Sequence, residues 1–155
     1  YTWVDCGSSY LPSELNAAYL YAQLTNADMI NNARLSSWNR YYSNLSDLAA
    51  RGLVELPTVP DYCEHNAHMF YIKAKNIEER TRLAAFLKQN EVTASFHYIP
   101  LHSSPAGKRF GRFSGEDVYT TKESERLLRL PMYYGLTDAD VDMVCELVGQ
   151  FYNSI

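Results

Sequence analysis

The stretch Met69–Lys75, with the sequence MFYIKAK, runs directly into Asn76–Glu79, with the sequence NIEE, and this junction decides the fold class. The first part predicts a β-strand with a polar end. The second part places Asn76 and Glu79 where an N-cap and its capping-box partner stand at the start of a helix. Val92–Ile99 predicts a second strand, because it is rich in β-branched and aromatic residues. A strand, a helix and a strand predict an α+β domain, whose helix carries the apolar residues Leu83, Phe86 and Leu87.

Two long helices are expected before this domain. Pro12-Ser13-Glu14 is a helix-start signal, because proline is tolerated in the first helical turn. A second helix follows and ends at Arg51-Gly52, with a cation and a glycine. The two prolines of Leu56–Asp61 forbid a helix and a central strand, so this segment is a linker. We therefore expect an inter-domain helical segment at 1–55 and a small C-terminal α+β domain at 56–155. The apolar stripe of the second helix is predicted at Trp38, Tyr41, Tyr42, Leu45, Leu48 and Ala49.

The remaining residues predict a loop and two further helices. Prolines and glycines between Pro100 and Gly115 predict a long loop. Helix signals return at Thr121–Glu125 and are broken at Leu130-Pro131, and Thr137 caps a last helix that has acidic residues in its first turn. The chain is thus predicted as long helices followed by a small α+β domain whose short sheet has two or three strands. The buried stripe of the last helix is predicted at Val141, Val144, Cys145, Val148 and Phe151.

Composition narrows the class of protein. The chain has 155 residues, of which 46% are apolar and 21% are charged, and its net charge is −4. This length suits one globular domain that needs no disulfide or metal to fold. The acidic balance argues against a DNA-wrapping protein, although a few local cations would suffice for an anionic small ligand. No apolar run approaches the ~20 residues of a membrane span. The three cysteines stand in unrelated settings and predict reduced thiols in a cytoplasmic protein.

Three other chemistries are poorly supported by residue spacing. Cys63–His68 holds three candidate metal ligands, and His97 and His102 add two, but no pattern converges four ligands on one point, so we expect no metal site. Lys108–Phe113, KRFGRF, interleaves cations and aromatic rings as single-strand nucleic-acid binders do. On an acidic chain this run better suits a solvated loop, or one that meets the phosphates of a small ligand. Cysteine catalysis is not expected, because Cys145 falls on an apolar stripe.

The densest set of reactive side chains is Phe96–His102, FHYIPLH. Strand alternation would place His97 and Ile99 on one face and Tyr98 on the other. Two histidines and a tyrosine at a strand end can bind an oxygen-rich ligand or assist proton transfer. Hydrogen-bonded rings that pack a strand end explain the same pattern equally well. Gly7–Tyr10 precedes the first helix, where its N–H groups and hydroxyls can contact a phosphate or simply cap the helix.

Three segments, in this order, resemble one protein family. They are Gly7–Leu24, the run His97–His102 with the pattern histidine-tyrosine-x-proline-leucine-histidine, and Glu125–Pro131, which ends in leucine-proline. All three are similar to the sugar-nucleotide aminotransferases of the DegT/DnrJ/EryC1/StrS family. The resemblance implies the C-terminal part of an aspartate-aminotransferase-type α/β fold. It also implies a homodimer with active sites at the subunit interface, and pyridoxal 5'-phosphate as the cofactor of the full-length enzyme.

The resemblance also assigns roles to residues. The family's Schiff-base lysine and the aspartate that pairs with the pyridine nitrogen lie in a large cofactor domain, upstream of the segments matched here. Because the chain opens at Tyr1 as if inside a fold, we expect a piece of a longer protein that contains no catalytic residue and is inactive alone. The residues implied to bind the substrate are Tyr98, His97 and His102, and those implied to bind the cofactor are Ser8, Ser9 and Tyr10.

Two further runs narrow the implied reaction. Gly7–Leu11 and His102–Gly107 resemble family members that move an amino group from glutamate to C4 of dTDP-4-keto-6-deoxyglucose, a step of enterobacterial common antigen synthesis. The expected partners are therefore a sugar nucleotide and glutamate, with no nucleic acid and no membrane. The competing hypothesis is a non-catalytic α+β module that serves in binding or dimerisation.

Overall fold

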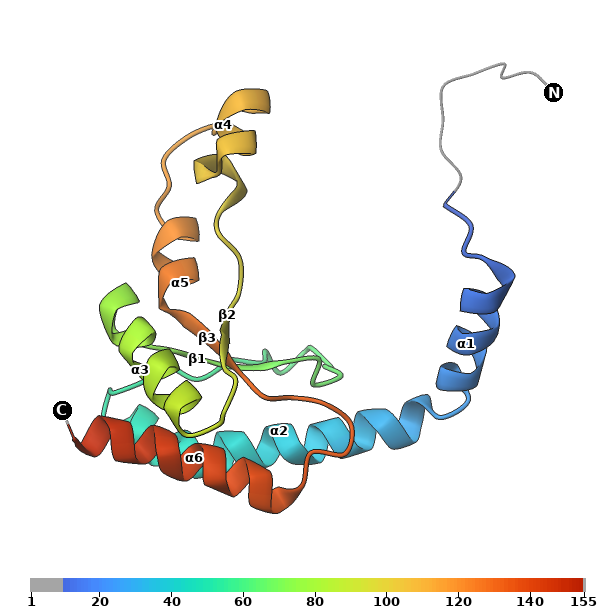
Figure 1. Cartoon of the computed structure of the whole chain (residues 1–155), viewed down its shortest axis with the longest axis horizontal. Helices are drawn as coiled ribbons and strands as arrows, with labels where there is room; N and C mark the ends of the chain where they lie inside the picture. The colour runs from blue at the N-terminus through green and yellow to red at the C-terminus, as the bar shows by residue number, and fades with distance from the viewer. Residues whose placement is uncertain (1–9, 155) are drawn as a thin grey trace.

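A computed structural model of the chain describes residues 10–154. Helices α2 and α6 lie side by side, a small sheet and α3 stand over them, and α5 and α4 rise from the sheet (Figure 1). No helix among the described residues is both long enough and apolar enough to span a bilayer. The elements in order are α1 (Glu14–Leu24), α2 (Ala27–Ala50), β1 (Phe70–Lys73), α3 (Ile77–Gln89), β2 (Ser95–Phe96), the 3-10 turn η1 (Leu101–Ser103), α4 (Pro105–Phe110), α5 (Thr120–Arg126), β3 (Leu127–Leu130) and α6 (Asp138–Asn153).

One apolar core joins the two long helices to the sheet. Tyr41 of α2, Phe70 of β1 and Val148 of α6 are fully buried in it. All five residues predicted for the stripe of α6 are buried, which confirms that stripe. The predicted stripe of α2 is confirmed for its buried members, but Tyr42 remains 41% exposed and stacks on Trp38 at the margin of the core. The bulk of the apolar stabilisation therefore comes from the contact of α2 with α6 and the sheet.

Charged groups also join α2 to α6. The Arg40 guanidinium donates from Nε to Oδ1 of Asp142 over 2.7 Å, and from Nη1 to Asp138 over 3.1 Å. Asn44 donates to the same Asp142 oxygen at 2.7 Å. The hydrogen bonds from Arg40 hold the pKa of the Asp142 carboxyl below its ordinary value. These contacts lie at the exposed edge of the helix pair, so they set its alignment more than its stability.

Strand β3 occupies the centre of the sheet, whose order is β1-β3-β2 with both pairings antiparallel. Phe70 pairs with Leu130 and Ser95 with Arg129. The sequence predicts helical structure up to Leu130, and this is wrong, because the helix α5 ends at Arg126 and the strand begins at Leu127. Leu128 and Leu130 are buried while their neighbours are partly exposed. This period-two burial and the pairing on both sides outweigh local helix propensity.

Strand β2 is shorter than expected. The sequence predicts a strand over Val92–Ile99, but only Ser95–Phe96 pairs with β3. The chain leaves the sheet at His97, three residues before Pro100. Pro100 itself could not continue the strand pairing, because its nitrogen has no hydrogen to donate. The reactive run that follows therefore lies beyond the sheet and not on one of its faces.

The predicted helix starts are confirmed by their caps. Thr137 and Asp140 form a complete capping box at α6. The Asn76 side chain accepts from the Glu79 N–H at 2.9 Å, as an N-cap should. The Glu79 carboxylate, however, accepts from the Lys75 N–H at 3.1 Å, one residue earlier than a standard capping box.

Helix α4 lies where the sequence predicts only a loop. Ser104 is its N-cap and accepts from the Gly107 N–H at 3.0 Å, while Pro105 fills the first helical position. Gly107 is required here, because a Cβ at this position would lie 1.7 Å from the Leu101 carbonyl oxygen. The turn η1 and α4 therefore pack backbone against backbone.

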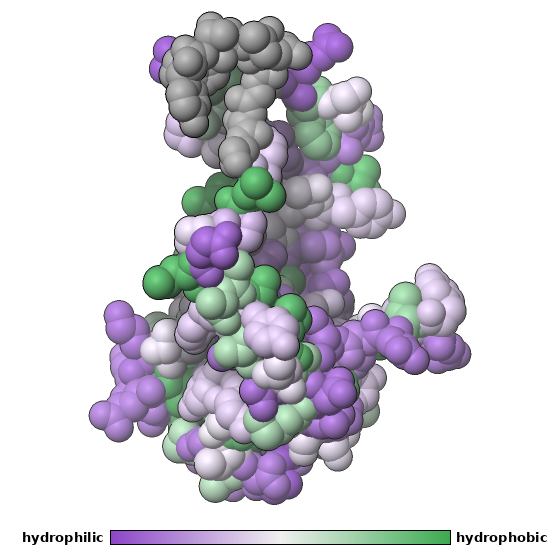
Figure 2. Space-filling view, turned by 90° about the vertical axis from the view of Figure 1, so that its right-hand side faces the viewer, coloured by the Kyte–Doolittle hydropathy of each residue, from purple (hydrophilic) through white to green (hydrophobic). Residues whose placement is uncertain are grey.

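Helix α1 stands apart from the core. None of its residues is buried, and Leu15, Tyr19 and Leu24 each expose more than half of their surface. It leads away from the far end of α2 (Figure 1), and apolar residues gather on the face that it presents (Figure 2). The stability of the described chain therefore owes little to α1.

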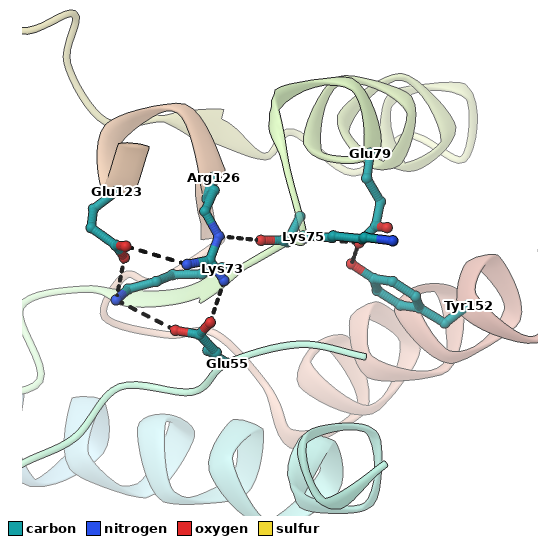
Figure 3. A network of polar contacts seen from close by, with 8 residues as sticks. Glu55, Lys73, Lys75, Glu79, Glu123, Arg126 and Tyr152 are labelled. Carbon is teal, nitrogen blue, oxygen red and sulfur yellow. Dashed lines mark hydrogen bonds and ion pairs between the residues drawn. The ribbon is translucent and has the colours of Figure 1, made fainter. Parts of the chain in front are cut away.

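A second charge network links three segments around β1 (Figure 3). Lys73 of β1 contacts Glu123 of α5 at 2.6 Å and Glu55, which follows α2, at 3.7 Å. Arg126 contacts both carboxylates and also donates to the Ala74 carbonyl oxygen at 2.8 Å. The hydrogen bond to Glu123 raises the pKa of Lys73, and the same bond lowers the pKa of Glu123. The network therefore holds the start of β3 against β1.

The network makes the stability of the chain depend on pH. The pKa of Glu123 lies below its ordinary value of 4.5, so its contribution is complete above that value and is lost as the pH falls through the lower folded-state pKa. Glu123→Gln should lower the free energy of unfolding by about 1 kcal/mol at neutral pH. It should also flatten the pH dependence in the acid range, as measured by urea denaturation.

Glu125→Gln is the matched control, because Glu125 lies exposed on the same helix. It should leave both the free energy of unfolding and its acid dependence nearly unchanged. Equal acid profiles for Glu123→Gln and the unchanged chain would contradict the prediction.

Candidate functional site

His97 and Tyr98 lie together where the chain leaves β2. Because the strand ends at Phe96, the two rings are not on opposite faces as alternation predicts; they meet edge to face with centroids 4.6 Å apart. The Nδ1 atom of His97 is buried without a hydrogen-bond partner among the described residues. Tyr98 is 72% exposed. A half-buried ring thus lies against an exposed phenol that is free to contact a ligand.

The Tyr98 side chain lines a hollow of about 380 Å³. Arg80 lies over the Phe96 ring at 5.5 Å, on one wall, and brings a cation to the hollow. The hollow therefore combines a phenol, hydroxyls and charges of both signs, a mixture that suits an oxygen-rich ligand. Its lining residues are Ile77, Arg80, Phe96, Tyr98, Ile99, Pro100, Ser103, Thr121, Ser124 and Glu125.

His102 lies in η1 and faces Asp117. Its Nε2 is 2.8 Å from Oδ2 of Asp117, and its ring lies beside Phe113 with centroids 4.4 Å apart. The Asp117 carboxylate also accepts from the hydroxyl and the backbone N–H of Thr121, the latter at 3.2 Å. The Thr121 hydroxyl, followed by its N–H and by His102, holds the pKa of Asp117 below the ordinary range. Asp117 thus ties η1 to the start of α5.

His102 lines a different hollow from Tyr98. Its hollow has a volume of about 510 Å³ and lies between η1, α4 and the start of α5. The structure therefore brings His97 and Tyr98 into contact and places His102 in a neighbouring space. Asp117 was missed by sequence reasoning. Its i, i+4 spacing to Thr121 signals a helix start, but no local pattern indicates its bond to His102. The lining residues are Leu101, His102, Ala106, Gly107, Phe110, Gly111, Arg112 and Thr120.

The predicted cofactor residues are mostly outside the described part of the chain. Ser8 and Ser9 precede residue 10, and Tyr10 is 93% exposed. Among residues 10–154, no group of three or more His, Cys, Asp and Glu side chains is placed to hold a metal ion.

A hollow of about 580 Å³ adjoins the network of Lys73 and Arg126. Lys73, Glu55 and Arg126 are engaged with one another, and Glu79 also accepts from the Tyr152 hydroxyl at 2.9 Å (Figure 3). Burial and this bond raise the pKa of Tyr152. Since most of its charged groups already have partners, we interpret this hollow as structural.

The fold and the exposed motif together define a class of protein. The chain has the fold of the C-terminal part of an aspartate-aminotransferase-type enzyme, as predicted from the sequence. It belongs to the DegT/DnrJ/EryC1/StrS aminotransferase family, whose sequence profile matches residues 1–149.

Individual relatives agree with this assignment. The chain is 29% identical over 156 residues to the uncharacterised protein MJ1066 of Methanocaldococcus jannaschii, covering 96% of this chain and 39% of that protein. The crystal structure of S. venezuelae DesV in complex with a ketimine intermediate superposes with a TM-score of 0.77 at 23% identity, over 92% of this chain and 37% of that one. NtdA from Bacillus subtilis with bound cofactor PMP gives a TM-score of 0.69 at 27% identity, over 81% and 29%. The chain thus spans about two fifths or less of these relatives.

Aminotransferases of this family depend on pyridoxal phosphate. Lys73 is engaged in the charge network around β1, where its hydrogen bond to Glu123 raises the pKa of its amino group. The remaining lysines, Lys75, Lys88, Lys108 and Lys122, are exposed to solvent.

Removing the Asp117 carboxylate should loosen the segment that carries His102. Asp117→Ala deletes the bonds to His102 and Thr121. Amide hydrogen exchange over residues 101–121 should therefore accelerate by roughly tenfold or more, with little change in β1 or α6. Glu116→Ala, at an exposed neighbouring carboxylate, is the control and should exchange like the unchanged chain. A uniform acceleration of exchange over the whole chain would indicate global destabilisation. It would contradict the prediction that Asp117 stabilises only the segment 101–121.

Proposed function

We propose that this chain is the substrate-facing, C-terminal part of a pyridoxal-phosphate-dependent sugar-nucleotide aminotransferase. The observation that carries the proposal is the family match over residues 1–149, combined with an exposed His97–His102 motif between two hollows. A motif held for packing alone would be buried, yet Tyr98 is mostly exposed. The cofactor, when bound, carries the amino group between the two substrates.

We further propose that the whole protein is a dTDP-4-amino-4,6-dideoxygalactose transaminase. It would take the amino group from glutamate and place it on C4 of dTDP-4-keto-6-deoxyglucose, in enterobacterial common antigen synthesis. The support is the similarity of the runs Gly7–Leu11 and His102–Gly107 to this enzyme. In this proposal Tyr98, His97 and His102 contact the sugar nucleotide, and Ser8, Ser9 and Tyr10 contact the cofactor phosphate.

The exposed helix α1 supports an inter-domain role for residues 1–55 and a homodimer. Its apolar side chains, among them Leu15, Tyr19 and Leu24, have no cover within the described residues. Apolar surface of this kind marks an interface, here with the large domain or a second subunit. Cys63 and Cys145 are free thiols, which suits a cytoplasmic protein.

The decisive experiment uses the full-length protein. With pyridoxal phosphate, glutamate and dTDP-4-keto-6-deoxyglucose, it should produce 2-oxoglutarate and a 4-amino sugar nucleotide, detected by mass spectrometry. A protein that binds no cofactor and forms no amino sugar would instead be the non-catalytic module.

The isolated chain of residues 1–155 should be inactive in the same assay, because the resemblance places the Schiff-base lysine in the large cofactor domain, upstream of the matched segments. Product formation should not exceed the rate of free pyridoxal phosphate. Turnover above that background would contradict the proposal that the catalytic residues lie in the large domain.

Tyr98→Phe in the full-length enzyme should lower kcat/KM for the keto sugar by about tenfold to a hundredfold. The expected loss is one ligand hydrogen bond, worth roughly 1.5–3 kcal/mol. The half-reaction with glutamate should change much less, because the phenol faces the sugar. Tyr62→Phe, at an exposed tyrosine that lines neither hollow, is the control. Equal losses in both half-reactions, or none in either, would make Tyr98 a structural residue only.

A further inference from the structure

The hollow beside His102 has an unusually apolar and exposed wall. Phe110 at the end of α4 is 78% exposed, and Leu101 of η1 is exposed to a similar degree. Both line the same space of about 510 Å³, together with Gly107 and Gly111. Gly107 is fixed by its close approach to the Leu101 carbonyl. An exposed ring on a rigid wall is a stacking platform for a flat group.

Three cations stand next to this platform. Lys108, Arg109 and Arg112 are all exposed, and Arg112 lines the hollow itself. Arg109 lies over the Phe110 ring at 4.8 Å. None of the three forms an ion pair with a carboxylate in residues 10–154.

Three basic side chains elsewhere in the chain are neutralised by carboxylates. Arg40, Lys73 and Arg126 are each paired with two carboxylates. The acidic residues of the segment 105–117 are Glu116 and Asp117, and the Asp117 carboxylate is engaged by His102 and Thr121. On a chain of net charge −4, this cluster is therefore a local positive site whose charge is available to an anion.

We propose that Phe110, Arg109 and Arg112 bind the nucleoside diphosphate part of the sugar nucleotide. This inference rests on the proposed function. The Phe110 ring stacks against the base, and the two guanidinium groups contact the diphosphate, for which their planar donor pairs are well shaped. Lys108 adds a third charge at the rim.

The position of the two hollows agrees with this assignment. Ser103 and Thr121 line the hollow of Tyr98, while their chain neighbours His102 and Thr120 line the hollow of Phe110. The two spaces are therefore adjacent. A sugar at Tyr98 would continue through its diphosphate toward Arg112 and end with its base at Phe110, in the order in which these groups are joined in a sugar nucleotide.

The test measures the binding of dTDP to the full-length protein by calorimetry. The double variant Arg109→Ala/Arg112→Ala should weaken dTDP binding by at least about tenfold and reduce its dependence on salt. Phe110→Ala should weaken dTDP and thymidine to a similar extent and leave inorganic pyrophosphate unaffected, whereas Phe110→Tyr should restore binding. Arg82→Ala, at an exposed arginine of α3, is the matched control and should bind dTDP like the unchanged protein.

The glutamate half-reaction separates this inference from the proposed function. If the variants bind dTDP more weakly and still react with glutamate at the unchanged rate, the subsite is supported. If they bind dTDP as the unchanged protein does, or if the unchanged protein binds no dTDP, the subsite is refuted. Absence of the glutamate half-reaction in the unchanged protein would refute the aminotransferase proposal, while the dTDP affinities would still decide the subsite.

Discussion

Strand β3 is the element on which the rest of the domain depends. It pairs with β1 on one side and with β2 on the other, although these two strands do not touch each other. Arg126, the residue just before it, binds carboxylates of two other segments and the Ala74 carbonyl. α5 ends at Arg126 and β3 begins at the next residue. The pairing that holds β3 in the sheet therefore also fixes the position of the end of α5 (Figure 1). The hollows beside Tyr98 and His102 both use the start of α5 as a wall.

The candidate site is thus built by two short segments that a single carboxylate holds together. Asp117 joins His102 of η1 to Thr121 of α5, and Gly107 lets α4 pack directly on η1. Several other side chains around the two hollows are exposed, among them Tyr98, Leu101 and Phe110. Such a surface is suited to contact with a ligand, since loops supported by a rigid scaffold commonly carry binding residues.

Local rules correctly predicted the helix starts at Asn76 and Thr137 and the strand β1, but they missed α4 and β3. Asn76 and Thr137 were identified as caps because an N-cap depends on residues only three positions away. The helix α4 was missed although Ser104 and Pro105 carry a comparable signal, because the surrounding glycines suggested a loop. The strand character of β3 is hidden from local patterns, because it depends on partners that lie 32 to 60 residues earlier in the chain.

The sequence by itself determined the helices α2 and α6, their buried stripes and the family, and it predicted a binding role for the run His97–His102, because periodicity and motifs are properties of neighbouring residues. Only the tertiary structure decided how that run is used. It ended β2 at Phe96, turned His97 and Tyr98 toward each other, and placed His102 with Asp117 in a separate hollow. These outcomes depend on strand pairing and on a hydrogen bond between residues 15 positions apart. Neither can be predicted from the local pattern of residues.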